Sequence, residues 1–510
     1  MAIRNIFSTS LPVAADAIQD IWTLEEGSRI ASDSFGFSYG GFFDVALVVG
    51  GSIRAASFGV IDEDASNPTL RVEETGSIFS GGFAVDFDGP VATVSNRGEI
   101  YSGGANTISM TGNFSQVYNS GEILGSGTAV RLTGDSGRLS NTGLIQGEGV
   151  YAVLLTGAGF RVDNDGTMIG FLNAVAAFQS EAIISNAGTM ESFNADGIIA
   201  IGDNITVNNS GSIQGYESGV EGFDDNARVT NTGTLFGVTE HGVSWMGVDA
   251  QITNHGLIDG ADLGVKIDGS GGHLTNTGDI TGGATGASMG AEIGQSTRLL
   301  NTGTITGGEA GITGGVSEDH VTNQGSIRGN IELGGGADTY NGRMGQIEGE
   351  VRMGGGADTI IGGTGAEVLK GGAGGDMMRG VGGDDEIVGG GGADTMYGGR
   401  GDDRMIGGGA RDTLIGGKGD DMMTGGRQVD TFVFGRRGGD DEITDFKDGE
   451  DLIDLSAFGL RPGQPPAVLS ALSNAGDGDA LLNFGDLGGD GSVLIRGLTL
   501  GTADATDFIL

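Results

Sequence analysis

The strongest constraint in this sequence is a nine-residue repeat that runs nine times without a gap through residues 353–433. Residues 389–397 read GGGGADTMY, and residues 416–424 read GGKGDDMMT. Most copies have glycine at positions one, two and four, and all have an acidic residue at position six and a large apolar residue at position eight. A period of this kind indicates a solenoid in which each repeat forms a turn and a very short strand.

The period also predicts which repeats become neighbours in space. If two repeats close one flattened coil, repeats 18 residues apart in the sequence stack at the strand separation of about 4.8 Å. Stacking would place Asp376 beside Asp394, and Asp385 beside Asp403. Carboxylates at such a distance repel each other unless a cation lies between them. The apolar residue two places after each acid would point inward and form a thin core.

Calcium is the cation that fits this arrangement. It is a hard ion that accepts six or more oxygen ligands, including the backbone carbonyls of turns that glycine permits. We therefore predict several Ca²⁺ ions as the cofactor of this block, held by its acidic residues and by turn glycines. The predicted ligand residues are Asp358, Glu367, Gly371, Gly374, Asp376, Gly380, Gly383, Asp385, Gly389, Gly392, Asp394, Gly398, Gly401, Asp403, Gly407, Asp412, Gly416, Gly419, Asp421 and Asp430.

The alternative is a flexible glycine-rich linker with scattered acids. A linker has no reason to keep register for eighty residues with an apolar side chain at every inward position. The copies do differ: Glu367 replaces aspartate, Val381 replaces the second glycine, and Ala410 and Gln428 replace the fourth. We expect weaker sites near Glu367, Asp412 and Asp430. The best-formed sites are expected beside Asp376, Asp385, Asp394, Asp403 and Asp421.

This block resembles the repeats-in-toxin (haemolysin-type) family, the calcium-binding proteins exported by bacterial type I secretion. Residues 430–434 (DTFVF), 441–446 (DEITDF) and 449–458 (GEDLIDLSAF) look like the segment that closes the β-roll of serralysin-type proteins. The terminal residues 506–510 (TDFIL) are similar to the uncleaved C-terminal signal of such proteins. The resemblance covers roughly residues 331–510. It implies calcium binding and export through the type I secretion apparatus.

The composition agrees with an extracellular location. The chain has no cysteine among its 510 residues, which suits a secreted protein stabilised by metal rather than by disulfides. Its net charge of −42 makes nucleic acid and anionic membranes poor partners. No segment has the length of apolar sequence that a membrane span needs. The first 21 residues lack the pattern of a secretory signal peptide, so the C-terminus is expected to carry the export signal.

The larger N-terminal part contains a longer repeat. An Asn-x-Gly triplet followed by an apolar residue recurs at spacings of 22 or 23 residues, with one of 25. Apolar and polar residues alternate around each triplet, which is a strand pattern. We expect the asparagines to lie inside the turns and to hydrogen-bond to one another along a ladder. They are Asn96, Asn119, Asn141, Asn164, Asn186, Asn209, Asn231, Asn254, Asn276, Asn301 and Asn323.

Together the two repeats predict an all-β fold. It consists of a right-handed parallel β-helix with coils of about 22 residues, continuing into a parallel calcium-binding β-roll with coils of 18 residues and a small C-terminal β region. The expected boundaries are residues 1–70 for an N-terminal cap with degenerate first coils, 71–330 for the β-helix, 331–352 for a transition coil, 353–434 for the roll, and 435–510 for the C-terminal region with its secretion signal.

Two features near these boundaries have alternative readings. The aromatic stretch from Phe35 through Tyr39 to Phe43, with Trp22 and Phe58, is interpreted as the core of the cap. The alternative is an exposed face for a partner or for self-assembly, because an uncapped β-helix exposes unpaired strand edges.

An aspartate upstream of the roll is the second such feature. Asp338 stands in a GGGAD sequence 20 residues before that of Asp358, so coil length is expected to shrink from 22 through 20 to 18 residues. This shrinkage suggests one continuous solenoid. Asp338 lies off the nonapeptide register and is interpreted as a candidate for an isolated calcium ligand.

No catalytic residues are predicted. The densest polar cluster comprises Tyr216, Glu217, Glu221, Asp224 and Asp225, with Glu240 and His241 about one coil later. These residues could share a face, but we expect no Arg or Lys near the cluster to neutralise a uronate, and acids on so acidic a chain are usually solvated surface. The His-Glu-x-x-His helix of metalloproteases and the sequence motif of the uronan epimerases are absent.

Three functions therefore stay open at the level of the sequence. The leading one is a secreted structural or adhesive protein of a bacterial surface or matrix, with a cell-surface or polysaccharide ligand. The second is a polysaccharide lyase or uronan epimerase that uses the β-helix groove, with the cluster around Glu217, Glu240 and His241 as its place. The third is self-association end to end into a filament.

Overall fold

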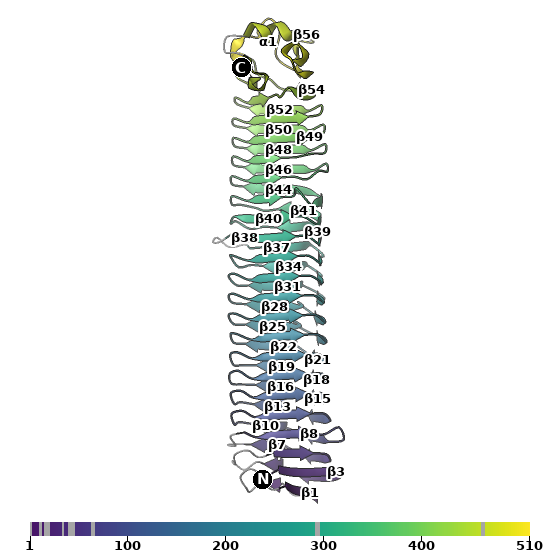
Figure 1. Ribbon diagram of the computed structural model, residues 1–510. Helices are drawn as coiled ribbons and strands as arrows, with labels where there is room; N and C mark the ends of the chain where they lie inside the picture. Colours follow the sequence, from purple (N-terminus) through teal and green to yellow (C-terminus); the bar gives the residue numbers. More distant parts are fainter. Residues whose placement is uncertain are drawn as a thin grey trace. The chain divides into compact units, whose positions relative to one another are not determined.

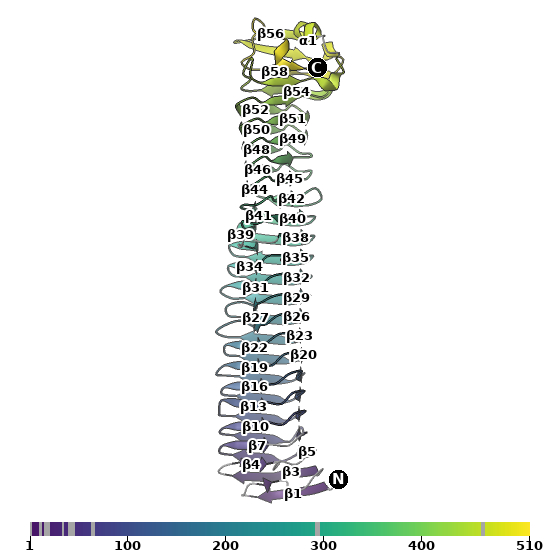
Figure 2. The same cartoon turned by 90° about the vertical axis from the view of Figure 1, so that its left-hand side faces the viewer.

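The alternation of apolar and polar residues around each Asn-x-Gly turn produces short parallel strands that stack coil upon coil (Figure 1 and Figure 2). The structure is a computed structural model that describes residues 3–9, 13–14, 21–32, 35–38, 46–62, 67–290, 296–460 and 465–510. It contains two compact units. Unit 1 comprises Met1–Gly269 with Asp279–Gly283, and unit 2 comprises Ser270–Gly278 with Ala284–Leu510.

A typical coil of unit 1 consists of three short strands. One coil contains β26 (Thr206–Asn209), β27 (Ser212–Gly215) and β28 (Val220–Phe223). They pair in parallel with β29 (Arg228–Asn231), β30 (Thr234–Gly237) and β31 (His241–Met246) of the next coil. Each strand contributes apolar side chains to the interior, and Val207, Ile213 and Val220 of this coil are fully buried. The predicted parallel β-helix is confirmed.

The asparagines form the predicted ladder. In unit 1, the side-chain amide of each asparagine from Asn96 to Asn231 donates to the side-chain oxygen of the next one, at 2.7–2.9 Å. In unit 2, Asn276 donates to Asn301 and Asn301 donates to Asn323, both at 2.9 Å. All of these side chains are buried. The first member, Asn96, has no donor for its Oδ1 because Val72 occupies the paired position one coil earlier.

The aromatic residues of the N-terminal segment pack partly as expected for a cap. The rings of Trp22 and Phe37 meet edge to face at 5.8 Å, and Phe37 is fully buried. Phe58 stacks on Phe83 of the next coil at 5.7 Å. Tyr39 and Phe43 lie outside the described residues.

Within unit 2 the coil length decreases toward the roll. Asn301 and Asn323 are 22 residues apart, Asp319 and Asp338 are 19 apart, and Asp338 and Asp358 are 20 apart, each pair being hydrogen-bonded in adjacent coils. The spacing then becomes 18 residues and stays there through the roll. Within this unit, the β-helix coils and the roll therefore form one solenoid, as the sequence predicts.

The roll has two rows of strands, one on each side. One row comprises β44 (Glu350–Gly355), β46 (Val368–Ala373), β48 (Glu386–Gly391), β50 (Arg404–Gly409) and β52 (Met422–Arg427). The other comprises β45 (Thr359–Ile361), β47 (Met377–Arg379), β49 (Thr395–Arg400), β51 (Thr413–Lys418) and β53 (Thr431–Val433). The apolar residue at position eight of every repeat, from Ile360 to Phe432, is fully buried. These side chains form the predicted thin core.

A small β region follows the roll. β54 (Arg437–Ile443) pairs with β52 and with β58 (Asp490–Ile495), which continues antiparallel to β57 (Asp479–Asn483) and β56 (Leu472–Gly476). A short helix, α1 (Pro465–Ala471), precedes β56. β59 (Phe508–Ile509) pairs with β55 (Leu452–Asp454), and Asp507 is fully buried, so the terminal residues pack on the last coil. No helix in the described part of the chain is long and apolar enough to cross a membrane.

Candidate calcium-binding roll

The stacked turns bring the predicted acidic residues together through the backbone. The amide N–H of Asp376 donates to Oδ1 of Asp394 at 2.8 Å, and that of Asp385 donates to Oδ1 of Asp403 at 2.9 Å. The same bond recurs from Asp358 to Asp430, always across 18 residues. One oxygen of each carboxylate therefore joins two neighbouring coils. The sequence predicted the proximity of these acids but not this hydrogen bond.

The second oxygen of each carboxylate has no hydrogen-bond partner. Oδ2 is buried and unpaired in Asp338, Asp358, Asp376, Asp385, Asp394, Asp403, Asp412, Asp421 and Asp430. These residues are at most 2% exposed. Burial raises the pKa of Asp394 to about 6 and that of Asp403 to about 7. A buried carboxylate that lacks a partner is unstable, so each free oxygen requires a proton or a cation.

The first glycine of each repeat leaves the space in which these oxygens converge. A Cβ atom on Gly389 would overlap Oδ2 of Asp394 and lie 2.8 Å from the carbonyl oxygen of Gly407. A Cβ atom on Gly371 would meet Oδ2 of Asp376 and the carbonyl oxygen of Gly389 in the same way. The same pair of neighbours recurs at Gly380, Gly398 and Gly407. Glycine at position one therefore does more than permit a turn, because any side chain would fill the pocket between carboxylate and carbonyl.

The second and fourth positions of the repeat need a left-handed backbone. Gly390 and Gly392 have φ angles of 115° and 132°. Val381, Ala410 and Gln428, which replace glycine at these positions, keep positive φ angles of 85°, 89° and 73°. Their turns thus retain the backbone conformation of the other repeats despite the strain that a side chain brings there.

The repeat of Glu367 is different. Neither Gly363 nor Gly365 adopts the left-handed conformation of the other turns. The longer side chain folds back onto its own turn, where Oε2 accepts a hydrogen bond from the N–H of Gly363 at 3.2 Å. This geometry agrees with the expectation of a weaker site near Glu367.

The donor set of the roll suits calcium. Each nonapeptide turn except that of Glu367 offers one free carboxylate oxygen and several carbonyl oxygens, the hard ligands that Ca²⁺ prefers. Among the described residues, no three His, Asp or Glu side chains gather around one point. A bound ion would therefore take most of its ligands from backbone carbonyls, as the glycine turns allow.

The acids form two rows, one on each side of the roll, and both rows extend beyond the nonapeptides. Asp338 is not isolated: its Oδ1 accepts from the N–H of Asp319 at 2.8 Å, and its own N–H donates to Asp358 at 2.7 Å. At the other end, Asp421 and Asp430 donate in the same way to Asp441 and Asp451.

The terminal members of the two rows, Asp319, Asp441 and Asp451, fall outside the nine-residue period and were not predicted, and Asp338 belongs to a row rather than standing alone. The shared signal was an apolar residue two places after the acid: Val321, Tyr340, Ile443 and Ile453. At the two ends of one row, Oδ2 of Asp319 accepts a hydrogen bond from the N–H of Gly315, and Oδ2 of Asp451 accepts one from the N–H of Lys447. These two carboxylates therefore have no free Oδ2, unlike the acids between them.

One side of the roll carries a second, exposed row of acids at position five. Asp402 donates its backbone N–H to Oδ1 of Asp384 at 2.9 Å, and Asp420 and Asp440 continue the row. The other side has no acid at this position, with Ala393 and Arg411 in its place. The two sides of the roll therefore differ in charge.

Outside the roll, the acidic cluster of the β-helix departs from the sequence interpretation. Lys266 lies close enough to act electrostatically on both Glu221 and His241. The expectation of a cluster without a neighbouring cation was therefore wrong, because Lys266 lies two coils after Glu221 and one coil after His241 in the stack. The cluster also includes Asp196, which lies about one coil before Glu221 and was not among the residues predicted from the sequence.

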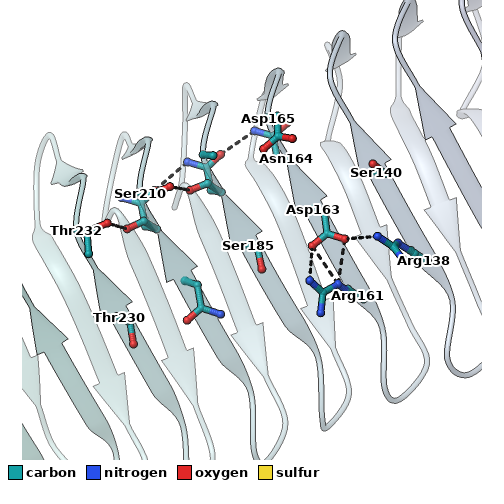
Figure 3. A pocket seen from close by; sticks show the side chains of 14 residues that line it. Arg138, Ser140, Arg161, Asp163, Asn164, Asp165, Ser185, Ser210, Thr230 and Thr232 are labelled. Carbon is teal, nitrogen blue, oxygen red and sulfur yellow. Dashed lines mark hydrogen bonds and ion pairs between the residues drawn. The ribbon is translucent and has the colours of Figure 1, made fainter.

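A groove of about 550 Å³ lies on another face of unit 1, over β17 (Arg138–Asn141), β20 (Arg161–Asn164), β23 (Ile183–Asn186), β26 and β29 (Figure 3). Its most prominent charges neutralise each other: Asp163 accepts from Arg161 at 3.0 Å and from Arg138 at 3.0 Å (Figure 3). The rest of the lining is mainly serine, threonine and asparagine.

Comparison with known proteins supports the interpretation of the nonapeptide block as calcium-binding repeats. Residues 354–387, 370–405, 379–414 and 397–432 match the RTX calcium-binding nonapeptide repeat family in four overlapping copies. A solution structure of a subunit from the Azotobacter vinelandii mannuronan C5-epimerase is 28% identical, with 29% of this chain and 80% of that one covered and a TM-score of 0.18. No curated protein matches the chain. The resemblance of this block to the repeats-in-toxin family is confirmed, and such repeats bind calcium.

Proposed function

We propose that this chain is a calcium-stabilised solenoid that works outside the cell as a structural or adhesive protein. The observation that carries the calcium part is the series of buried carboxylates whose Oδ2 atoms have no partner. The match to RTX calcium-binding repeats supports the same assignment.

The calcium ligands are proposed to be the free Oδ2 atoms together with turn carbonyls of adjacent coils. Asp394 and the carbonyl of Gly407 form one such pair, and Asp376 and the carbonyl of Gly389 form another. When bound, the ion would neutralise the carboxylates and link one coil to the next. The chain's own residues hold the coils in register through the Oδ1 hydrogen bonds, so ion binding adds to a frame that the backbone already defines.

The extracellular and adhesive parts of the proposal follow from the composition and from the repeats. RTX repeats, a chain without cysteine and a strongly acidic composition all fit a secreted protein in a calcium-rich medium. Regular stacking of coils provides a long polar surface without requiring chemistry at any one place. Ligand presentation and matrix building are the roles that such a surface suits.

The test is calcium titration of the full chain, followed by calorimetry and by thermal unfolding with and without a chelator. We expect several ions to bind and the roll to melt at a lower temperature when calcium is removed, with magnesium unable to replace it. Glu122→Gln, an exposed acid of unit 1, serves as a control that leaves calcium binding unchanged. Identical melting with and without calcium would refute the proposal.

A polysaccharide lyase or uronan epimerase is the second candidate. The cluster of Asp196, Glu221, His241 and Lys266 favours it, because it combines acids of raised pKa with a histidine and a cation. Incubation with alginate and pectin, followed by detection of unsaturated or epimerised products, tests this candidate. Turnover that disappears in His241→Ala would establish it in place of the adhesive function.

A further inference from the structure

The groove of about 550 Å³ in unit 1 has a floor made by one row of polar side chains (Figure 3). Each member is the third residue of its strand, and the strands β17, β20, β23, β26 and β29 pair in parallel register. Because paired strands lie about 4.8 Å apart, the row presents one polar group per coil at a regular spacing. We call this row, in coil order, the floor row: Ser140, Asp163, Ser185, Asn208 and Thr230.

Most of the floor row has unused hydrogen-bonding groups. Apart from Asp163, its side chains make no hydrogen bond to any other residue that the structure describes, and all are half-buried or exposed. The neighbouring turn residues that also line the groove differ in this respect. The hydroxyl of Ser210 donates to the carbonyl of Asn186, and that of Thr232 donates to the carbonyl of Asn209, both at 3.3 Å. The free donors and acceptors are therefore those of the floor, where a ligand in the groove would meet them.

Two arginines hold further donors at the first coils of the groove. Nε and Nη2 of Arg161 bind the carboxylate of Asp163 at 2.9–3.0 Å, and Nη2 of Arg138 binds the same carboxylate at 3.0 Å. The two arginine side chains are 50% and 51% exposed. A guanidinium group carries five N–H donors, so Arg138 retains donors on Nε and Nη1. Asp163 thus fixes both groups in place before any ligand binds, which lowers the entropic cost of binding.

An exposed aromatic ring continues the floor row one coil earlier. Tyr118 of β14 (Gln116–Asn119) pairs in register with Ser140 and is 38% exposed. Its hydroxyl donates to Oε1 of Gln116 at 2.6 Å, which orients the ring against its own strand. A ring followed in register by free hydroxyl and amide groups suits a molecule that has both apolar faces and many hydroxyl groups.

We propose that this groove binds an extended, uncharged polysaccharide that lies along the stacked coils. One face of a sugar ring is apolar and packs on Tyr118, while sugar hydroxyls donate to and accept from the floor row and accept from Arg138. The strand separation of about 4.8 Å is close to the length of one sugar unit in an extended chain, so successive sugars meet successive coils. This inference rests on the proposed adhesive function and names its ligand class.

The charges of the groove favour a neutral glycan. Its charged lining residues are Arg138, Arg161, Asp163 and Asp165, two of each sign, so the groove offers an acidic polymer no net attraction. The whole chain has a net charge of −42, which repels such a polymer. An uncharged polysaccharide experiences no such repulsion.

The test is calorimetric titration of the full chain, loaded with calcium, with soluble polysaccharides: a β-glucan, a xylan, a galactomannan and, for comparison, alginate. We expect at least one of the neutral polysaccharides to bind and alginate to bind about tenfold more weakly. Failure of every neutral polysaccharide to bind, or equal binding of alginate, would overturn the inference.

Two variants test the proposed contacts. Tyr118→Ala should weaken neutral binding about tenfold, because it removes the ring on which a sugar packs. Asn208→Leu should weaken it about threefold to tenfold, because it removes one hydrogen-bonding group of the floor without breaking a bond of the protein. Tyr101→Ala is the matched control and should leave binding unchanged, since Tyr101 is 36% exposed on β12 (Glu99–Ser102), outside the groove.

Full binding by both variants would also refute the inference, and circular dichroism of each variant shows whether the fold is retained. If Tyr118→Ala fails to fold, Asn208→Leu alone decides the outcome. Calcium binding without glycan binding defeats only this inference, whereas glycan binding by a chain that binds no calcium defeats the calcium part of the proposed function.

Discussion

The asparagine ladder of unit 1 offers a matched pair of substitutions on one strand. Asn208 and Asn209 are neighbours on β26, but Asn208 is exposed and Asn209 is 2% exposed. The side-chain amide of Asn209 donates to Oδ1 of Asn231 at 2.8 Å and to the carbonyl of Thr234 at 2.9 Å. Its own Oδ1 accepts from Asn186 at 2.9 Å. Asn209→Leu removes these three bonds and a fourth, from the same amide to the carbonyl of Gly211 at 3.2 Å, while Asn208→Leu removes none of them.

The expected loss follows from the groups left behind. Oδ1 of Asn231 loses its side-chain donor inside the coil, and an unsatisfied buried polar group costs about 1–3 kcal/mol. Asn186 retains two backbone acceptors, the carbonyls of Gly188 and Ser212, so its amide adds little to that figure. We therefore expect Asn209→Leu to lower the local free energy of unfolding by about 1–3 kcal/mol. Asn208→Leu should change it by less than about 0.5 kcal/mol.

Hydrogen exchange followed by mass spectrometry measures this effect where it occurs, because repeat proteins open locally. Since each 1.4 kcal/mol is a tenfold change, amides of the coils around β26 should exchange about 5- to 140-fold faster in Asn209→Leu. Equal exchange in the two variants would refute the reasoning. It would mean that the ladder bonds are replaced without loss, and that burial of leucine offsets them.

Three other predictions concern single residues. Asp394→Ala should weaken calcium binding more than Glu367→Ala in calorimetry, because Asp394 has a free buried oxygen and Glu367 bonds to its own turn; the reverse order would contradict the proposed ligands. Val381→Gly should increase the free energy of unfolding of the roll by about 1 kcal/mol and raise its melting temperature, because it removes a β-branched side chain from a residue with a φ angle of 85°. A lower melting temperature would argue against backbone strain at this residue. Burial, with the negative charge of Glu221, raises the pKa of Asp196 to about 7 from 3.8, so this group stabilises the fold fully below about pH 4 and loses that contribution as the pH rises through about 7. Exchange near Asp196 should accelerate over that pH range and should become flatter with pH in Asp196→Asn; an unchanged profile would count against the raised pKa.

The roll could be predicted almost completely because its repeat is strict. An acid every nine residues and an apolar residue two places later are enough to place Asp376 beside Asp394 and to bury Met378. The β-helix could be predicted equally well, because the spacing of the Asn-x-Gly triplets gives the coil length and each triplet contains the asparagine that points inward. In both blocks one coil resembles the next, so residues at the same position of the repeat have the same surroundings in every coil.

The acids that lie beyond the nonapeptide repeats were harder to predict from the sequence. Asp319 and Asp441 each continue one of the two rows of nonapeptide acids, yet their spacing to the neighbouring member is 19 or 20 residues rather than 18. A search for a fixed period misses them. Backbone pairing tolerates a longer loop between strands, and only the strand register identifies the row.

The sequence by itself determined the fold class, the coil lengths, the inward residues and the presence of calcium-binding repeats. These properties depend on residues close together in the chain, or on a period that repeats them. Tertiary structure alone decided which oxygen of each carboxylate is free, and which residues share a corner of the β-helix. Asp196 and Glu221 lie in adjacent coils, and Lys266 takes the register position of Glu221 two coils later. No local pattern marks the place where such distant, non-repeating side chains come together.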